Sequence, residues 1–262
     1  MPTNLLTEID ARGLATVTMN RPELHNAFDD LLIAELTKEL RRLDADPQVR
    51  VVILAASGKS FSAGADLNWM RRMADYSRQE NLADSISLAG LMSTLNRLSK
   101  PTIALVQGAA YGGGVGLVAC CDIALATDRA TFCLSEVKLG LIPAVISPYV
   151  VEAIGSRAAR RYFLTAERFD AAEAQRLGLV HELVAADELR ARGESLAALL
   201  VQNGPSALTE AKKLLAVLTN TPIDDAMIAE TARRIADIRS SDEGKDGVSA
   251  FLQKRPPVWV KG

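Results

Sequence analysis

The chain has 262 residues, enough to bury a full hydrophobic core as one large domain. Its composition is 48% hydrophobic and 24% charged, with a formal net charge of −2, which is ordinary for a globular protein. That charge, with no run of Lys or Arg longer than two, argues against a nucleic-acid-binding surface. Three cysteines without a CxxC pair and two histidines without metal-ligand spacing predict neither a disulfide framework nor a metal site.

The first residues, "MPTNLLTEID", lack the basic start and apolar run of a signal peptide. No apolar stretch elsewhere is long enough to span a bilayer. We therefore expect a cytoplasmic protein that has neither a membrane nor a nucleic acid as its partner.

In chain order, residues 5–10 and 14–19 alternate as a pair of antiparallel strands joined by a tight turn. Residues 20–28, "NRPELHNAF", are predicted to form a loop. A helix is predicted from Asp29 to Asp46, because its leucines recur on one face. The apolar run of residues 49–56 predicts a strand buried on both faces, and residues 57–66 then read as a polar loop.

Helices are predicted over residues 67–98, followed by a buried strand at 102–107 that leads directly into a cluster of glycines. Further strands are predicted at 122–127, 130–135 and 179–184, with a loop over 136–145, and every pattern after residue 187 is helical. The alternation of strands and helices indicates an α/β fold. Ligands are expected where loops leave the carboxyl ends of the strands.

The glycine cluster offers a false dinucleotide motif. Gly114 to Ala119 fits G-x-G-x-x-A after a strand, and Glu136 lies twenty residues beyond Gly116. However, the helix between the flanking strands can have only about two turns, too few for the roughly 30-residue unit that the motif requires. No Gly-Lys-Ser/Thr follows either, so we expect neither a nicotinamide cofactor nor a P-loop.

Two turns share the same character. "FSAGAD", Phe61 to Asp66, and "YGGG", Tyr111 to Gly114, each follow a strand, turn through small residues and open a helix. Helix N-termini leave backbone N–H groups unpaired, so two such turns can bring two amides to one oxygen as an oxyanion hole. One such donor contributes about 2.7–4 kcal/mol to transition-state stabilisation. Alternatively, some of these glycines only let a helix pack closely on a sheet.

"FSAGADL", "GAAYGGGVGLVACCDIALA", "LSEVKLGLIP" and "FLQKRPPVW" resemble the crotonase (enoyl-CoA hydratase/isomerase) family over essentially the whole chain. The resemblance implies an α/β spiral of repeated ββα units in residues 1–197 and a helical trimerisation region in residues 198–262. It also implies a homo-hexamer made of two trimers. The substrate would be an acyl-CoA thioester, with coenzyme A part of the substrate and no separate cofactor or metal.

Site residues follow from the resemblance by motif. The amides of Ala65 and Gly113 would polarise the thioester carbonyl, and Glu136 would act as acid and base. Coenzyme A would contact Leu24 and Ala27 of the early loop, although the basic residue common in that loop is missing. The other implied binding residues are Ala63, Asp66, Leu67, Gly112, Phe251 and Lys254, with Asp66 expected to cap its helix rather than react.

The sequence departs from the family at one position. Hydratases with two carboxylates have a second glutamate where this chain has Gly116. Glu136 remains, and the apolar residues around it (Leu134, Val137, Leu139, Leu141 and Ile142) should bury it and raise its pKa above about 4.3. What would hold the attacking water in place of the missing glutamate is not evident. These motifs therefore leave both hydratase and isomerase open.

A narrower resemblance favours hydration. "FSAGADLNWMRRM", "CLSEVKLGLIPAVISPYVVEAIG" and "RRYFLTAERFDA" are similar to bacterial 3-methylglutaconyl-CoA and isohexenylglutaconyl-CoA hydratases of leucine and acyclic terpene degradation. Both substrates carry a distal carboxylate, for which Arg72 and Lys138 are the candidate contacts. A third hypothesis, a non-catalytic scaffold that binds coenzyme A or RNA, is disfavoured by the acidic balance and by the presence of Glu136.

Overall fold

The computed structural model describes residues 3–219 and 221–260. Its strands are β1 (Leu5–Ile9), β2 (Leu14–Met19), β3 (Val51–Ala56), β4 (Ser60–Ser62), β5 (Thr102–Val106), β6 (Ala109–Tyr111), β7 (Ile123–Thr127), β8 (Thr131–Cys133), β9 (Phe169–Asp170) and β10 (Glu182–Val184). Its α-helices are α1 (Asp30–Ala45), α2 (Leu67–Ala74), α3 (Arg78–Asn96), α4 (Gly113–Cys120), α5 (Ser147–Thr165), α6 (Ala171–Leu177), α7 (Leu189–Val201), α8 (Pro205–Leu218), α9 (Asp225–Ser240) and α10 (Asp242–Gln253). Two short 3-10 helices, η1 (Pro22–Leu24) and η2 (Glu136–Leu139), interrupt loops.

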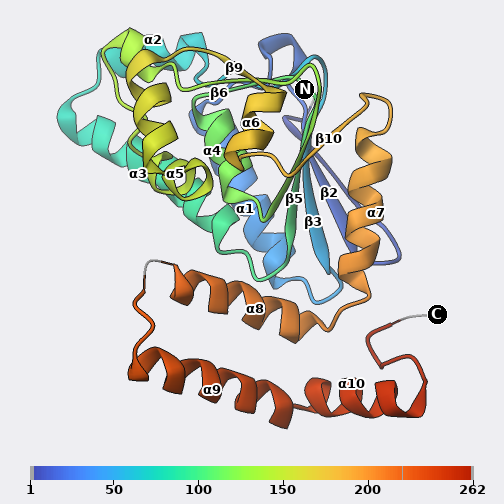
Figure 1. The fold of residues 1–262 in the computed structure, drawn as a ribbon. Helices are drawn as coiled ribbons and strands as arrows, with labels where there is room; N and C mark the ends of the chain where they lie inside the picture. The colour runs from blue at the N-terminus through green and yellow to red at the C-terminus, as the bar shows by residue number, and fades with distance from the viewer. Residues whose placement is uncertain (1–2, 220, 261–262) are drawn as a thin grey trace.

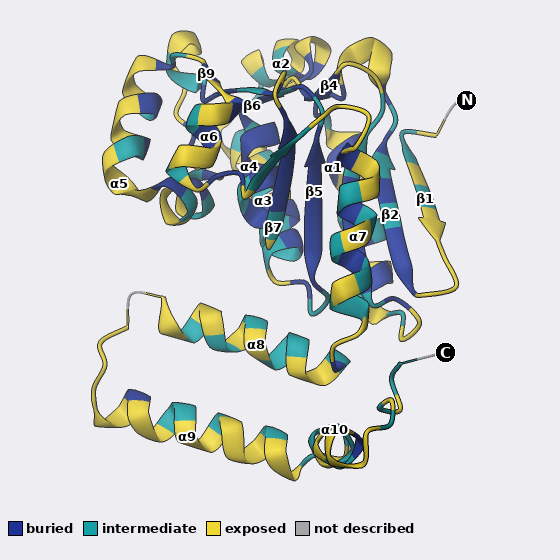
Figure 2. Ribbon diagram, turned by 45° about the vertical axis from the view of Figure 1, so that its right-hand side comes forward, coloured by how far each residue is buried: buried dark blue, intermediate teal, exposed yellow. Residues whose placement is uncertain are grey.

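The larger sheet has the strand order β1-β2-β3-β5-β7-β10 and is parallel except for the predicted β1–β2 hairpin. Its central strands are buried on both faces, as their apolar sequences predict (Figure 2). Alternate residues point to opposite sides. Val52 and Leu54 face the core shared with α1, α3 and α4, whereas Val51 and Ile53 face the smaller core under α7 (Figure 1).

The smaller sheet, β4-β6-β8-β9, was only partly predicted. Residues 60–62 were expected in a loop and residues 109–111 were not assigned to a strand, yet both form strands that pair in parallel through Ser60 with Ala109 and Ser62 with Ala110. Three residues are too few to show a period of two in sequence, so the sequence could not reveal these strands. Strands β3, β5 and β7 are each followed by a short strand of the smaller sheet and then a helix. These ββα units confirm the predicted α/β crotonase-like spiral.

Other expectations need small corrections. The predicted strand over 179–184 is limited to β10, and the predicted loop over 136–145 begins with η2. The helix after the glycine cluster has eight residues, which confirms that it is too short for a dinucleotide-binding unit. Asp29 caps α1, its side chain accepting from the amide of Leu32.

Helices α8, α9 and α10 form a tail at the end of the molecule opposite α2 and β6 (Figures 1 and 2). The predicted division between residues 197 and 198 falls inside α7, whose Ala197 is buried in the core under the larger sheet. That boundary remains a prediction. None of the helices in the described ranges is long and apolar enough to cross a membrane.

Arg50 joins the tail to the core, and Glu243 holds two helices of the tail together. Arg50, directly before β3, donates to the carbonyl oxygens of Val201 and Asn203 at the end of α7 and to that of Trp259. Glu243 of α10 accepts from the amides of Ser206 and Ala207 in the first turn of α8, and its carboxylate so caps the N-terminus of that helix. The tail therefore has a defined attachment to the core.

Candidate active site

The two glycine turns meet at the end of the smaller sheet. Because β4 and β6 are parallel neighbours, their carboxyl ends lie side by side and the turns that follow them are adjacent. Gly64 has φ +91° and Gly112 has φ +49°, a region that favours glycine. A Cβ on Gly64 would lie 3.2 Å from the carbonyl oxygen of Tyr111, so a side chain there would push the two turns apart.

Each turn presents a free amide. Phe28 forms an isolated parallel bridge with Ala65, in which the amide of Phe28 donates to Gly64 and the amide of Asp66 donates to Phe28. This pattern leaves the Ala65 N–H outside the bridge. Gly113 is the first residue of α4, where an amide has no partner within its helix. Within residues 3–219 and 221–260, neither of these two amides donates to any acceptor.

Glu136 lies against the same turns. A Cβ on Gly112 would be 3.1 Å from Oε1 of Glu136 and 4.0 Å from the α-carbon of Gly64. The other carboxylate oxygen, Oε2, is buried and has no hydrogen-bond partner among the described residues. Burial raises the pKa of Glu136 above its usual value of 4.5, in the predicted direction.

The predicted cause of that burial is only partly correct. Leu134 is fully buried, but Leu139, Leu141 and Ile142 are exposed and leave the carboxylate to be covered from elsewhere. The glycine turn at Gly112 lies directly against it. A backbone turn from another repeat therefore helps to cover the carboxyl group, a contribution that the adjacent apolar residues in the sequence could not reveal.

The space beside Gly116 is filled. A Cβ on Gly116 would lie 2.3 Å from Cγ2 of Ile146 and 3.2 Å from Cε of Met92. Ile146 is 3% exposed and Met92 is fully buried, so neither can swing into solvent to make room. The place of the second family glutamate is thus taken by apolar side chains. Sequence analysis quoted this stretch within "CLSEVKLGLIPAVISPYVVEAIG" but did not assign Ile146 to the site.

The early loop packs onto the first turn. Ala63 donates its amide to the carbonyl of His25, and Ala27 donates to Leu24, so the predicted coenzyme A contacts Leu24, Ala27 and Ala63 lie close together. Two residues that sequence analysis did not single out organise this loop. The buried Arg21 pairs with Asp29 at 2.8 Å and lies 3.8 Å from Asp66.

Asn26 is the second of these organising residues. It is fully buried, and its side-chain amide donates to the carbonyls of Ser57 and Ser60. Only the structure reveals the burial of Arg21 and Asn26, and both are paired, as buried polar groups of this kind usually are.

Asp66 caps α2, as predicted, by accepting from the amides of Asn68 and Trp69. Leu67 follows it and is 69% exposed beside the turn. Of the two candidates for a distal carboxylate, Arg72 pairs with Asp30. Lys138 is exposed on η2, two residues from Glu136, and takes part in none of the ion pairs found among the described residues.

Phe251 and Lys254 are not part of this site within one chain. Both lie at the end of α10, and the tail is at the opposite end of the molecule from α2 and β6 (Figure 1). Phe251 is 83% exposed. Their predicted contact with coenzyme A would require a neighbouring subunit and remains a prediction.

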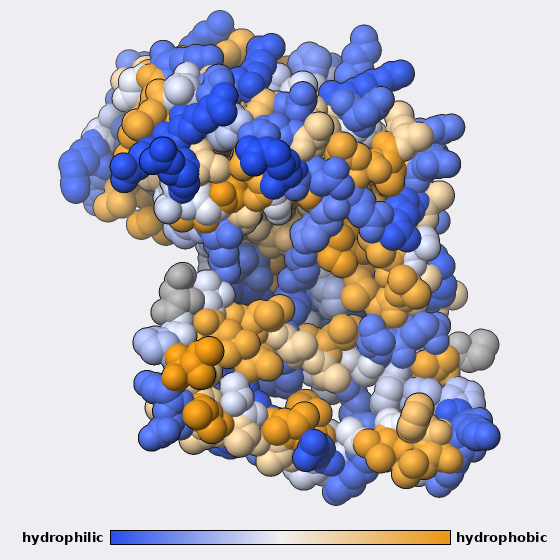
Figure 3. Space-filling view, in the orientation of Figure 1, coloured by the Kyte–Doolittle hydropathy of each residue, from blue (hydrophilic) through white to orange (hydrophobic). Residues whose placement is uncertain are grey.

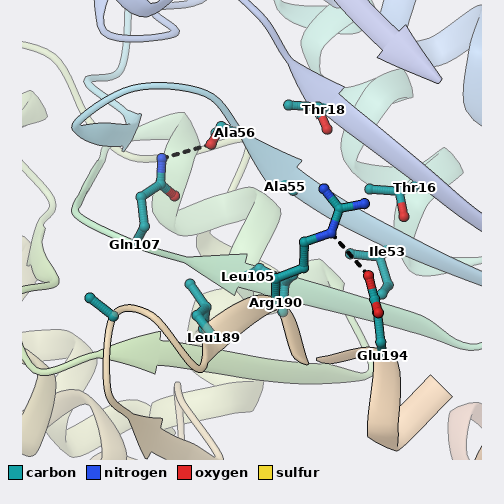
Figure 4. A pocket seen from close by; sticks show the side chains of 11 residues that line it. Thr16, Thr18, Ile53, Ala55, Ala56, Leu105, Gln107, Leu189, Arg190 and Glu194 are labelled. Carbon is teal, nitrogen blue, oxygen red and sulfur yellow. Dashed lines mark hydrogen bonds and ion pairs between the residues drawn. The ribbon is translucent and has the colours of Figure 1, made fainter. Parts of the chain in front are cut away.

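A separate groove of about 220 Å³ lies on the other face of the larger sheet, beside α7. Figure 4 shows Gln107 bonded to the carbonyl of Ala56 and Arg190 paired with Glu194 at its rim. None of the predicted site residues lines this groove. Gln107 bonds to backbone carbonyls, Arg190 and Glu194 pair with each other, and the remaining polar groups are the hydroxyls of Thr16 and Thr18, so the groove offers no reactive group comparable to Glu136.

Residues 10–262 match the model of the family described as "Enoyl-CoA hydratase/isomerase". The chain belongs to the enoyl-CoA hydratase/isomerase family. A Thermus thermophilus relative provisionally named enoyl-CoA hydratase is 35% identical over 96% of this chain and 99% of its own length. The 2,3-dehydroadipyl-CoA hydratase of Escherichia coli is 31% identical, with 92% of each chain covered.

Solved structures of similar proteins agree with this membership. An enoyl-CoA hydratase from Shewanella pealeana superposes with a TM-score of 0.96 at 49% identity, covering 98% of this chain and 96% of the other. Pseudomonas aeruginosa AtuE gives a TM-score of 0.93 at 36% identity, covering 99% of this chain and 100% of the other.

As a member of the enoyl-CoA hydratase/isomerase family, the protein is an enzyme, and an acyl-CoA thioester substrate is consistent with that family. Hydratases predominate among the named relatives, but isomerases also occur. A Dictyostelium discoideum relative named Delta(3,5)-Delta(2,4)-dienoyl-CoA isomerase is 30% identical over 97% of this chain and 90% of its own length. Family membership alone therefore leaves the choice between hydration and isomerisation to the geometry of the site.

Proposed function

We propose that this family member adds water across the 2,3-double bond of a 3-branched glutaconyl-CoA, such as 3-methylglutaconyl-CoA or isohexenylglutaconyl-CoA, in leucine or acyclic terpene catabolism. The observation that carries the proposal is a buried carboxylate, Glu136, against a turn whose neighbouring amide is free. Together with the free amide of Ala65, this arrangement suits a thioester oxygen held by two backbone donors.

The chemistry follows from charge. Hydrogen bonds from Ala65 and Gly113 would draw electrons onto the thioester oxygen and make the β-carbon electrophilic. Glu136 would take a proton from water as the oxygen bonds to the β-carbon, forming an enolate stabilised by the two amides. The same carboxyl group would then deliver the proton to the α-carbon, so that one acid–base group serves both steps. The pKa of Glu136, raised by burial, suits it better than an ordinary carboxylate for accepting and returning a proton.

Lys138 is the better candidate for the distal carboxylate of such a substrate. It is exposed on η2 close to Glu136, and it takes part in no ion pair found within residues 3–219 and 221–260. Arg72 is already paired with Asp30, and a second carboxylate would have to compete for it. An ammonium group near the acyl end would attract a dicarboxylic acyl thioester over a neutral one.

One observation favours a second candidate, a 3,2-enoyl-CoA isomerase. Shifting a double bond needs a single base to move a proton across an enolate and requires no ordered water. Ile146 and Met92 fill the space beside Gly116 with apolar groups, so no second carboxylate is available there to hold a water. The free amides and Glu136 would serve this reaction equally well.

The proposed assembly is a cytoplasmic homo-hexamer of two trimers. Its support is the exposed apolar surface of the tail, which is orange along the lower half of Figure 3. The contributing side chains are at least 60% exposed: Leu215, Ile223, Val248, Phe251, Leu252 and Val258. Apolar side chains so exposed mark a surface that another subunit covers. Sedimentation velocity would test the assembly, with a monomer as the contradicting result.

Incubation with 3-methylglutaconyl-CoA tests the reaction, because hydration removes the absorbance of the conjugated thioester. We expect the absorbance to fall and a 3-hydroxy thioester to accumulate. A 3-enoyl-CoA offered in parallel distinguishes the second candidate, since isomerisation makes the same absorbance rise. No turnover of either glutaconyl thioester, methyl or isohexenyl, would contradict the proposed hydratase.

A further inference from the structure

Ile146 occupies an unusual position for an apolar side chain. It occupies the N-cap position of α5 without a side-chain hydrogen bond, and its Cγ2 lies 2.3 Å from the point where a Cβ on Gly116 would stand. Real atoms cannot approach so closely, so residue 116 can only be glycine while residue 146 carries this methyl group. A side chain at residue 116 and the Cγ2 methyl group of residue 146 therefore exclude each other, and this chain has the methyl group.

Buried side chains of α3 and α4 lie beside this methyl group. Met92 of α3 approaches the same point, with its Cε at 3.2 Å, and its sulfur lies 3.9 Å from Sγ of Cys120 one turn further along α4. Ile146, Met92 and Cys120 are all at most 3% exposed. Burial also raises the pKa of Cys120 far out of the physiological range, so this thiol stays neutral and acts as an apolar wall.

This wall lies next to the proposed reaction centre. Gly116 is three residues after Gly113, so it lies roughly 4.5 Å further along the axis of α4, within the same turn. The thioester oxygen would lie on the Gly113 amide, which puts the α- and β-carbons close to this first turn. If a carboxylate stood here, an alkyl branch on the β-carbon of the substrate would remove water from it at a cost in free energy. A methyl group here would instead pack against that branch.

We propose that Ile146 determines specificity, its Cγ2 methyl forming an apolar wall that selects thioesters with an alkyl branch on the β-carbon over unbranched ones. This inference rests on the proposed function, because it places the β-carbon beside α4. It concerns binding, however, and so holds whether the bound thioester is hydrated or isomerised. One methyl group in a close-fitting apolar pocket changes selectivity by about 10–200-fold.

The test compares two pairs of thioesters on the intact oligomer. Saturated 3-methylbutanoyl-CoA and butanoyl-CoA report binding without reaction, through their Kd values. The 2-enoyl counterparts, 3-methyl-2-butenoyl-CoA and 2-butenoyl-CoA, report kcat/KM. We expect the wild type to prefer the branched member of each pair by at least about 10-fold. Ile146→Ala should reduce that preference to near 1, mainly by weakening the branched ligand.

Three further variants keep the test decisive. Ile146→Val retains Cγ2 and should retain the preference. Ile146→Leu keeps the volume but removes the β-branch, so it should lose the preference even if Ile146→Ala does not fold. Val150→Ala, one turn along α5 and fully buried, should destabilise the protein without changing the ratio of the two ligands.

The outcomes separate the two proposals. An unchanged Kd ratio in Ile146→Ala and Ile146→Leu would overturn the role of Ile146, and so would a wild type without any preference for the branched ligand. A changed Kd ratio in an enzyme that turns over neither 3-methylglutaconyl-CoA nor isohexenylglutaconyl-CoA would instead leave that role intact and refute the proposed hydratase.

Discussion

Glu136 and Gly112 are in contact although they belong to different repeats: Oε1 of the glutamate lies 3.1 Å from the point where a Cβ on Gly112 would stand. Gly112→Ala should therefore displace the carboxylate as well as strain the turn, whose φ is +49°. We expect kcat/KM to fall about 100-fold, the typical effect of a 1 Å misplacement. The strain should lower the free energy of unfolding by about 1–3 kcal/mol. Steady-state kinetics and urea unfolding measure the two effects.

Gly155→Ala is the matched control for that prediction. Gly155 also has a positive φ, +74°, but no atom lies within 4 Å of a Cβ built there. It should lose comparable stability and keep its kcat/KM. Equal catalytic losses in the two variants would mean that strain alone, rather than contact with Glu136, explains the effect at Gly112.

Replacing the carboxylate itself tests its acid–base role. Glu136→Gln keeps the shape of the side chain but cannot accept a proton, so kcat should fall about 10²–10⁴-fold. The Kd for a saturated acyl-CoA should stay within a few-fold of the wild type. Glu188→Gln, at an exposed position before α7, should leave kcat unchanged. Full activity of Glu136→Gln would instead support the non-catalytic scaffold.

The buried position of Glu136 predicts a pH dependence. Burial raises the pKa of Glu136 above 4.5, and only the ionised form can act as the base. The value of kcat/KM should therefore decrease as the pH falls through that raised pKa, with its acid limb above pH 4.5. An acid limb at or below 4.5, or the same limb in Glu136→Gln, would contradict this assignment.

The same pKa shift has a consequence for stability. A carboxyl group with a raised pKa in the folded state favours folding fully below its unfolded-state pKa, and this contribution is lost as the pH rises through the folded-state value. Above that value the ionised Glu136 opposes folding. Glu136→Gln should therefore raise the Tm at neutral pH, and the difference should shrink below pH 4.5. Thermal unfolding at several pH values measures it.

The exclusion between Gly116 and Ile146 predicts a non-additive pair. Gly116→Ala forces a Cβ against Ile146 and should destabilise the protein by about 1–3 kcal/mol. Ile146→Ala removes the clashing methyl and should cost about 2–5 kcal/mol by itself. In the double variant the closest atom, Cγ2 at 2.3 Å, is gone and only Cβ of residue 146, at 2.9 Å, remains close, so the clash is reduced and we expect a coupling energy of about 0.5–3 kcal/mol from urea unfolding. Purely additive losses would mean that the two residues do not compete for the same space.

Arg50 predicts how the tail is attached. Arg50→Ala leaves the carbonyls of Val201, Asn203 and Trp259 without their donor. Losing even one charged hydrogen bond of this kind costs about 1.5–3 kcal/mol. Amide hydrogen exchange in α10 should accelerate, whereas exchange in β3 and β5 should not. Arg239→Ala, at an exposed position on α9, is the control and should change neither. Unchanged exchange in α10 would place the attachment elsewhere.

Long apolar patterns made much of this fold predictable. The leucines of α1 and the apolar runs of β3 and β5 set their element type locally, because each is long enough to show a period or a buried run. The two glycine turns were also visible as turns, since only glycine adopts such backbone conformations freely. In contrast, β4 and β6 have three residues each and carry no detectable period.

The features of the site also divide into those that the sequence predicts and those that only the structure reveals. The sequence by itself determined that the chain has two glycine turns able to present amides, Glu136 as the one family glutamate, and Gly116 at the position of the second. These features are residue identities and local backbone conformations. Only the tertiary structure decided that the turns meet and that Ile146 fills the space beside Gly116. The first depends on parallel pairing of two strands 49 residues apart, from Ser60 to Ala109, and the second on packing between α4 and α5. Such contacts join segments that are distant in the sequence. Their energy comes from strand pairing and close packing, which involve residues outside any one local stretch.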